Sequence, residues 1–341
     1  MPALLWDVYC RVVDNLGDAG ICWRLAAGLA ARGQRVRLVI DDVAPLAFMA
    51  PGGAAGVEVL PWPGPAAAGD VVIEAFGCDP PATTVESMAR RALPPVWINL
   101  EYLSAEAYVE RSHGLPSPQL QGPGLGLTKW FYYPGFTPRT GGLLREPGLL
   151  AERAAFDRMA WWRAQGIAVR PGERVVTLFC YDNPALPALL QDLAHQPTLL
   201  LLTPGPAQQQ VTAPPAGVRL HRLPWLSQAG FDRLLWSADL NFVRGEDSLV
   251  RALWAGAPFV WQAYPQHDGA HAAKLHALLQ AWQPPPAVAA LWQAWNGLRA
   301  DWPGLPTPWA AETLAWRAAL LRQPDLVTQL LAFVVAHPGK P

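Results

Sequence analysis

The sequence LLWDVY at residues 4–9 begins the stretch that decides the fold. It reads as a short apolar strand, and an Ala- and Leu-rich segment at 21–31 follows it. That segment predicts a helix, which ends before Gly33, a typical C-cap residue. A second apolar segment at 36–40 predicts another strand. This order is a βαβ unit, in which a right-handed crossover joins two parallel strands, so the first half is predicted to be α/β.

Further buried strands are predicted in both halves of the chain. They lie at 71–76, 96–100, 175–180, 198–202, 218–220, 239–243 and 258–263. Helical stretches between most of the later strands indicate a second doubly wound sheet. Loops are expected over 103–148, where Gly and Pro interrupt the pattern.

The expected domain boundary follows a predicted helix at 156–164 that ends at Gly166. The expected domains are therefore 1–166 and 167–323. A final helix at about 324–337 begins with Pro and Asp, which suit a helix start, and is expected to pack back on the first domain.

The composition fits a globular chain of two domains. At roughly 100 to 200 residues per domain, a length of 341 residues predicts two domains. Apolar residues make up 51% and charged residues only 16%, which excludes a mainly disordered chain. With 26 basic and 27 acidic residues, the net charge of -1 creates no global positive field. Nucleic acid and anionic membranes are therefore not expected as partners.

The same sequence favours a soluble, cytoplasmic protein. Apolar runs such as 287–292 are far shorter than the about 20 residues of a membrane span. Asp7 stands where a secretory signal would carry basic residues. The four cysteines form no CxxC pair, so reduced thiols are expected, and neither a disulfide framework nor a zinc site is indicated.

The first segment with candidate chemistry is DNLGDAG at 14–20, between the first strand and the first helix. Asp14 and Asp18 lie at the carboxyl end of a strand, where α/β proteins gather their sites. Two carboxylates there suit proton abstraction or the orientation of a cationic acceptor. The alternative is that Asp18 only caps the helix and Asp14 only starts a turn.

The second segment is FVRGEDSL at 242–249, where a predicted strand meets a helix. The free N–H groups of that helix start, together with the Ser248 hydroxyl, could bind phosphate. Glu246 could accept hydrogen bonds from sugar hydroxyls while the amides of Asp247 and Ser248 face a diphosphate. A helix cap without a ligand is the alternative.

The third segment is YPQHDGAH at 264–271, after the last predicted strand. The phenol of Tyr264 could donate to a phosphate oxygen. His267 and His271 are four residues apart, but neither an HExxH motif nor a clear third ligand accompanies them, so no metal site is expected.

Together the three segments resemble the EarP family, the arginine rhamnosyltransferases that modify bacterial translation elongation factor P. The matching stretches are WDVYCRVVDNLGD at 6–18, RGEDS at 244–248, and YPQ at 264–266 with DGAH at 268–271. They span both halves of the chain and occur in the family's order.

The resemblance implies a GT-B glycosyltransferase, with two Rossmann-like domains facing each other across a cleft. The C-terminal domain would bind the nucleotide sugar, dTDP-β-L-rhamnose. The acceptor would be one arginine of elongation factor P, and the anomeric centre would invert. Neither a cofactor nor a metal is implied.

The resemblance also implies roles for individual residues. Asp18 would be the general base or the carboxylate that orients the acceptor, Asp14 its partner in binding the guanidinium, and Glu246 a third catalytic carboxylate. The substrate-binding residues would be Asn15, Gly17, Phe179, Tyr181, Gln228, Phe231, Glu246, Asp247, Ser248 and Tyr264, and Gly17 would let the donor sugar approach the backbone.

Within this set, Phe179 and Tyr181 would be an aromatic pair on the nucleotide side, and Gln228 and Phe231 would complete a thymine pocket. Core packing is the alternative for Phe179 and Phe231, because aromatic residues in such strands usually pack.

Two other functions remain open on the residues alone. One is a GT-B transferase that uses another nucleotide sugar and a small-molecule or glycan acceptor. The other is a sugar-nucleotide isomerase or a non-catalytic binding protein with the same architecture. The pair Asp14 and Asp18 favours transfer, because a pure binder needs no such pair and an isomerase needs no protein acceptor.

Overall fold

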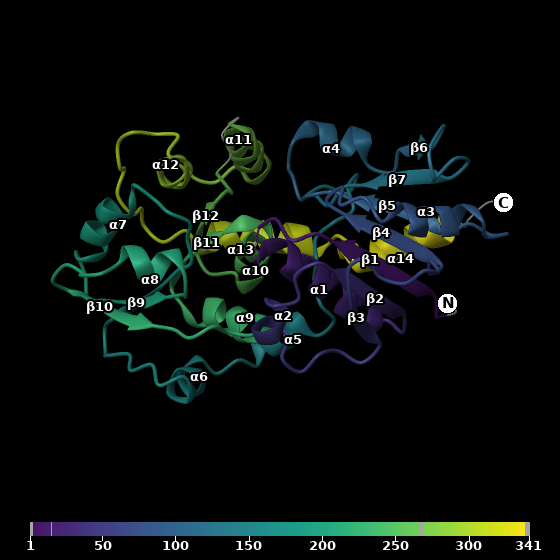
Figure 1. The fold of residues 1–341 in the computed structure, drawn as a ribbon. Coiled ribbons are helices and arrows are strands. Elements are labelled where there is room, and N and C mark those ends of the chain that lie inside the picture. Colours follow the sequence, from purple (N-terminus) through teal and green to yellow (C-terminus); the bar gives the residue numbers. More distant parts are fainter. Residues whose placement is uncertain (1–2, 15, 266–268, 338–341) are drawn as a thin grey trace. The chain divides into compact units, whose positions relative to one another are not determined.

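The computed structural model describes residues 3–14, 16–265 and 269–337 (Figure 1). The chain divides into two compact units, Met1–Pro147 with Gln323–Pro341, and Gly148–Arg322. Each unit is built on its own sheet with helices around it. The α/β class predicted from the sequence is therefore present in both halves.

The first unit contains a seven-stranded sheet with the order β3-β2-β1-β4-β5-β7-β6. Its neighbouring strands are parallel except β6 and β7, which are antiparallel. The strands are β1 (Leu5–Cys10), β2 (Arg35–Ile40), β3 (Val57–Pro61), β4 (Val71–Ala75), β5 (Val96–Leu100), β6 (Pro116–Pro118) and β7 (Thr128–Tyr132). The helices are α1 (Gly17–Ala30), α2 (Leu46–Met49), α3 (Ala82–Ala89), α4 (Ala107–Ser112) and α14 (Leu326–Ala336).

Both faces of the first sheet are covered, which explains why most residues of its central strands are apolar. On one face, Val8 and Ile73 pack with residues of α1 and α14. On the other face, Val72 packs with Val85 and Met88 of α3. Because the helices cover the faces of the sheet, polar side chains can gather at the carboxyl ends of its parallel strands.

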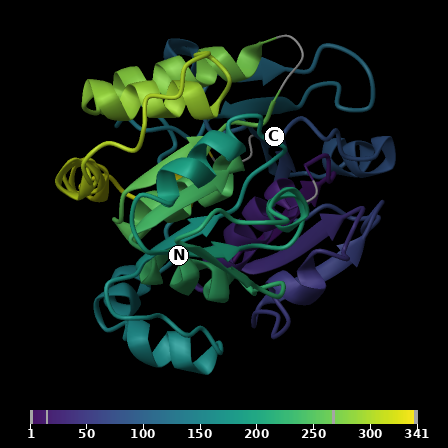
Figure 2. The same cartoon turned by 90° about the vertical axis from the view of Figure 1, so that its left-hand side faces the viewer.

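The second unit contains a five-stranded parallel sheet with the order β10-β9-β8-β11-β12. The strands are β8 (Arg174–Leu178), β9 (Thr198–Leu202), β10 (Val218–Arg222), β11 (Leu240–Arg244) and β12 (Phe259–Gln262). The helices are α5 (Leu149–Ala154), α6 (Arg158–Ala164), α7 (Leu186–Leu193), α8 (Pro206–Gln210), α9 (Gln228–Ser237), α10 (Gly245–Ala255), α11 (Ala270–Trp282), α12 (Pro286–Trp295) and α13 (Ala310–Leu321). Helices lie on both sides of this sheet (Figure 2).

The boundary between the units lies at Pro147 and Gly148, earlier than the expected 166/167. The helix α6 belongs to the second unit because Trp162 packs with Val175 and Leu234 in its core. Gly166, which suggested the boundary, only ends that helix with a left-handed φ of 67°.

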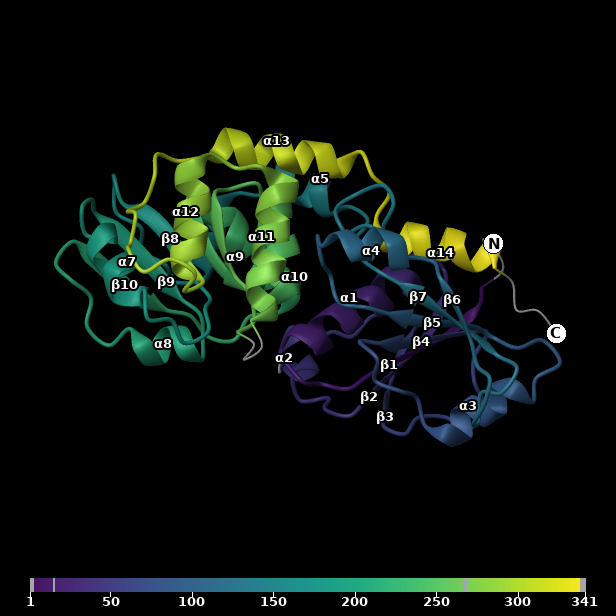
Figure 3. The same ribbon diagram turned by 90° about the horizontal axis from the view of Figure 1, so that it is seen from above.

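The final helix α14 belongs to the first unit, where Val327 and Leu330 join the core beside α1. Figure 3 shows α14, in yellow, with the elements of that unit. Asp325 caps this helix by accepting from the Thr328 N–H at 3.1 Å. The same carboxylate pairs with Arg32 at the end of α1, at 2.8 Å.

The stretch Ala310–Ala336 is long and apolar enough to cross a membrane by length and composition. The second half of this stretch overlaps the final helix predicted at about 324–337. In the structure it forms two helices, since α13 ends at Leu321 and α14 begins at Leu326, in different units. Each helix is shorter than the about 20 residues that a span requires. The absence of a membrane partner stays a prediction.

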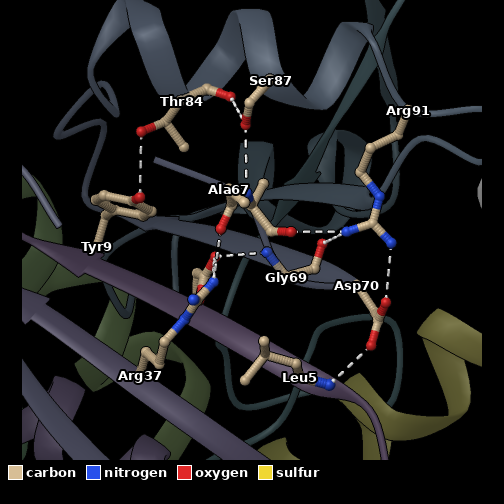
Figure 4. Close-up of polar contacts among 11 residues, drawn as sticks. Leu5, Tyr9, Arg37, Ala67, Gly69, Asp70, Thr84, Ser87 and Arg91 are labelled. Carbon is tan, nitrogen blue, oxygen red and sulfur yellow. Dashed lines mark hydrogen bonds and ion pairs between the residues drawn. The ribbon is translucent and has the colours of Figure 1, made fainter. Parts of the chain in front are cut away.

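A buried carboxylate holds the centre of the first sheet to the segment before β4. Asp7 of β1 is fully buried and pairs with Arg37 of β2, with Oδ1–Nε at 2.6 Å and Oδ2–Nη2 at 2.8 Å. The Gly69 N–H donates to the same carboxylate at 2.7 Å. Arg91 pairs with Asp70 at 3.0 Å, so a second arginine secures the same segment (Figure 4).

We expect Arg37→Met to destabilise the first unit by about 3–5 kcal/mol, because the Asp7 charge would stay buried without its partner. Hydrogen exchange of peptides from β1 and β2 measures the change in that unit alone. Arg90→Met is the control, since Arg90 forms an exposed pair with Glu86 at 3.5 Å and its loss should change nothing measurable. Unchanged exchange in Arg37→Met would contradict the prediction.

Candidate active site

The loop between β1 and α1 is organised around the side chain of Asp18. This residue lies in the first turn of α1 and is only 1% exposed. Its Oδ2 atom accepts hydrogen bonds from the N–H groups of Val13 at 2.8 Å and Asp14 at 2.9 Å. Asp18 therefore fixes the loop that carries the other predicted carboxylate.

A tyrosine that the sequence analysis did not select completes the environment of Asp18. The Tyr102 hydroxyl, just beyond the end of β5, donates to Asp18 Oδ1 at 3.3 Å. The Tyr102 ring stacks on Phe76, beyond the end of β4, with centroids 4.1 Å apart and 8° between the planes. Phe76 has a left-handed φ of 57°, a strained backbone for a bulky residue. The sequence could have pointed to Tyr102 only through its position just after a predicted strand, at the edge of the sheet where α/β proteins gather their sites.

The pKa of Asp18 is raised, chiefly because burial penalises the charged form. The two backbone N–H groups and the Tyr102 hydroxyl oppose this rise, while the nearby Asp14 charge adds to it. A carboxylate with a raised pKa is a stronger base than an exposed one. The position therefore suits proton abstraction.

Asp14 and Gly17 are closely packed in the same loop. Asp14 is half-buried, and a Cβ added at Gly17 would lie 2.8 Å from Asp14 Oδ2. Glycine at position 17 thus leaves room for the Asp14 carboxylate; its assigned contact with a donor sugar stays a prediction. Asn15, also assigned to substrate binding, lies outside the described residues.

We expect Tyr102→Phe to move the acidic limb of the pH–rate profile to higher pH. The hydroxyl stabilises ionised Asp18 and lowers its pKa, so its loss raises that pKa further and leaves less of the base ionised at low pH. Loss of one such hydrogen bond corresponds to about one pH unit. The measurement is kcat/KM from about pH 5 to about pH 9.

The control for this variant is Tyr9→Phe, which removes a different phenol of the same unit, one that is fully buried. The Tyr9 hydroxyl bonds to Thr84 at 3.4 Å rather than to Asp18. This variant should keep the wild-type profile. A Tyr102→Phe profile that coincides with wild type would show that the hydroxyl does not tune Asp18.

In the second unit, the start of α10 carries three of the predicted residues. Glu246 and Asp247 lie in its first turn, after Gly245 with a left-handed φ of 71°. Ser248 is buried, and its hydroxyl donates to the Arg244 carbonyl one turn earlier. In this structure the Ser248 hydroxyl is thus engaged with the helix backbone, and the expected phosphate contact of that hydroxyl would require it to rotate.

The predicted aromatic residues form one cluster around Arg244, the last residue of β11. The Arg244 guanidinium carbon lies 4.6 Å from the Phe179 ring centre and 4.3 Å from that of Tyr181. Phe231 contacts Phe179 edge-on at 5.4 Å, and Tyr264 contacts Tyr181 edge-on at 5.3 Å. Tyr264 is 49% exposed, so the cluster is open to a ligand on that side. Arg244 stood in the quoted RGEDS motif, but the sequence did not show that it contacts two aromatic rings.

Gln228 and Phe231 lie on the first turns of α9, whose position is fixed by a buried ion pair. Asp232 of α9 pairs with Arg251 of α10 through two contacts of 2.7 Å each. Both side chains are almost fully buried. The pair therefore holds the predicted thymine pocket to the helix that carries Glu246.

The structure thus assembles two groups, one in each unit. The first contains Asp14, Gly17 and Asp18, with Tyr102 added. In the second, Arg244 and the predicted aromatic residues are in contact, Gln228 lies on α9 with Phe231, and the predicted residues of α10 directly follow Arg244. His271 lies on α11, whereas His267 is outside the described residues. Within the described ranges, no group of three His, Cys, Asp or Glu residues is arranged to hold a metal. The expectation that no metal is needed stays a prediction.

Residues 6–335 match the family model described as elongation factor P (EF-P) rhamnosyltransferase EarP. The chain belongs to the EarP family of protein-arginine rhamnosyltransferases. It is 43% identical to a protein-arginine rhamnosyltransferase of Pseudomonas putida, over 96% of this chain and 98% of that protein. A protein of the same description from Neisseria meningitidis is 33% identical, over 98% of each chain. The predicted family is confirmed, and the chain is a glycosyltransferase enzyme.

A solved structure from a study of EarP-mediated arginine glycosylation of translation elongation factor EF-P is also similar. It has a TM-score of 0.66 and 32% identity, and the match covers 98% of this chain and 99% of that one. The calicheamicin glycosyltransferase CalG4 has a TM-score of 0.54 at 16% identity, over 98% of this chain and 99% of that one, which supports the fold alone. The predicted GT-B fold of two Rossmann-like domains is confirmed.

Proposed function

We propose that this EarP-family protein transfers L-rhamnose from dTDP-β-L-rhamnose to one arginine side chain of translation elongation factor P. The reaction inverts the anomeric carbon, uses no metal or cofactor, and takes place in the cytoplasm. The observation that carries the proposal is the buried Asp18 carboxylate, held by two backbone N–H groups and Tyr102, in a family of arginine rhamnosyltransferases.

The acceptor explains why a base of this kind is needed. An arginine guanidinium stays protonated in water, and its nitrogen lone pairs are delocalised, so it is a poor nucleophile. Asp18 takes a proton from the attacking nitrogen while Asp14 holds the charged group. The nitrogen forms a bond to the anomeric carbon as the bond from that carbon to the diphosphate oxygen breaks, and dTDP leaves.

The second group of residues suits the donor. Phe179, Tyr181 and Phe231 offer aromatic surface to a thymine base, and Gln228 offers an amide to its polar edge. The N–H groups at the start of α10 suit the diphosphate. Glu246 accepts from donor hydroxyls, and Arg244 supplies positive charge for the leaving group.

The partners follow from the same reasoning. Elongation factor P supplies the arginine, and the nucleotide sugar is the only other substrate. The four cysteines are free, in keeping with a reducing compartment. The near-neutral net charge of -1 supports a reaction that involves neither nucleic acid nor a membrane surface.

The test is the intact mass of elongation factor P after incubation with this protein and dTDP-β-L-rhamnose. A UDP-sugar serves as the donor control. We expect a single deoxyhexose increment that fragmentation maps to one arginine. Replacement of that arginine by lysine should remove the increment. An increment with the UDP-sugar, or none with dTDP-β-L-rhamnose, would overturn the proposed donor and acceptor.

A further inference from the structure

Two carboxylates stand at the start of α10, beside the place proposed for the donor's diphosphate. Glu246 and Asp247 both lie in the first turn of this helix. The Glu246 side chain is only 14% exposed, so water screens its charge weakly. A diphosphate bound to the N–H groups of the same turn would be repelled unless the carboxylate charge is balanced.

A lysine from another helix meets this carboxylate directly. Lys274 of α11 places its Nζ atom 2.7 Å from Glu246 Oε1, and its side chain is 23% exposed. The helix that carries it is anchored in the core, since Leu275, Leu278 and Leu279 are buried. Because a packed helix carries Lys274, the position of its ammonium group is better defined than in an ion pair between two exposed side chains.

We propose that Lys274 is a positioning residue for the donor. It neutralises Glu246 and fixes that carboxylate through its Oε1 atom, so that the diphosphate can bind to the first turn of α10 without a metal ion. The inference rests on the proposed function, because it concerns the same donor site. Lys274 lies outside all three of the sequence motifs.

The role differs from that of Arg244, the other cation near the aromatic cluster. Arg244 stacks on the rings of Phe179 and Tyr181 and donates to the Cys180 carbonyl at 3.3 Å. Lys274 instead contacts the carboxylate itself. If its role is to cancel the Glu246 charge, the effect of removing Lys274 must depend on whether Glu246 is charged. That dependence makes the inference testable.

The experiment is a double-mutant cycle on dTDP binding, measured by calorimetry with the full chain. We expect Lys274→Met to weaken dTDP binding about tenfold. Lys274→Arg, which keeps the charge, should bind within about threefold of wild type. In the Glu246→Gln background, Lys274→Met should weaken binding by less than about twofold, because no carboxylate is left to neutralise.

Kinetics and a matched control complete the test. Lys274→Met should raise KM for the nucleotide sugar more than it lowers kcat, a split that a general loss of folded protein would not produce. The control is Arg299→Met, which removes a positive charge from an exposed pair with Asp301 in the same unit and should leave dTDP affinity unchanged.

The outcomes separate the inference from the function on which it rests. If wild type does not bind dTDP, the proposed donor is wrong and the inference falls with it. If wild type binds but Lys274→Met binds equally well, only the inference is overturned. An equal loss of affinity in the wild-type and Glu246→Gln backgrounds also overturns it, because Lys274 would then act without that carboxylate.

Discussion

Asp18→Asn is expected to abolish rhamnose transfer while leaving dTDP binding intact. Asparagine has nearly the same size, and its oxygen can still accept the N–H groups of Val13 and Asp14 that hold the loop. It cannot take a proton from the acceptor guanidinium. Loss of a general base lowers rates by about 10²- to 10⁴-fold.

The measurement is the transfer rate by intact mass, with dTDP affinity from calorimetry. Asp41→Asn is the matched control. Asp41 accepts the Val12 N–H at 2.9 Å in the same loop region but is exposed, and its variant should retain activity. Transfer by Asp18→Asn at nearly the wild-type rate would refute the assignment of Asp18 as the base.

Arg244→Met is expected to weaken donor binding by about 2–3 kcal/mol. The variant removes the cation that contacts the faces of the Phe179 and Tyr181 rings. It also removes positive charge from the site proposed for the diphosphate. Cation–π contacts contribute about 0.5–2 kcal/mol, and hydrogen bonds to charged groups about 1.5–3 kcal/mol.

Calorimetry with dTDP measures this loss, and Arg244→Lys separates its two causes. Lysine keeps the charge but lacks the planar guanidinium that stacks on aromatic rings, so intermediate affinity is expected. Wild-type affinity in Arg244→Met would mean that the aromatic cluster does not bind the nucleotide. Full recovery in Arg244→Lys would mean that charge alone matters and stacking does not.

The strands were the most predictable part of the fold, and the domain boundary was less so. The strands β1 and β4 are readable because they are buried on both faces and therefore mostly apolar, with one buried acid in each, Asp7 and Glu74. The boundary at 166/167 was wrong because Trp162 of α6 packs with core residues that follow it in the chain. No local pattern records which core a helix joins.

The region 103–148, which was predicted to contain only loops, includes two strands of the first sheet, β6 and β7. In the structure, β7 pairs in parallel with β5 and carries the half-buried Trp130. Its flanks are rich in Gly and Pro, so the sequence pattern indicated only turns. The strand β7 is stabilised by hydrogen bonds to β5, which is distant in sequence, and the sequence of β7 alone does not record that pairing.

The α/β class, the family and the position of the acidic loop could be read from the sequence alone, because each depends on residues that are close together in the chain. Asp14 lies three and four residues before Gly17 and Asp18, which begin α1, and Glu246 shares a helix turn with Asp247. Only the tertiary structure brought Tyr102 to Asp18, across 84 residues, and Lys274 to Glu246, across 28. The physical reason is that a hydrogen bond or an ion pair depends on distance in space, and folding sets that distance by packing segments whose separation in sequence leaves no local pattern.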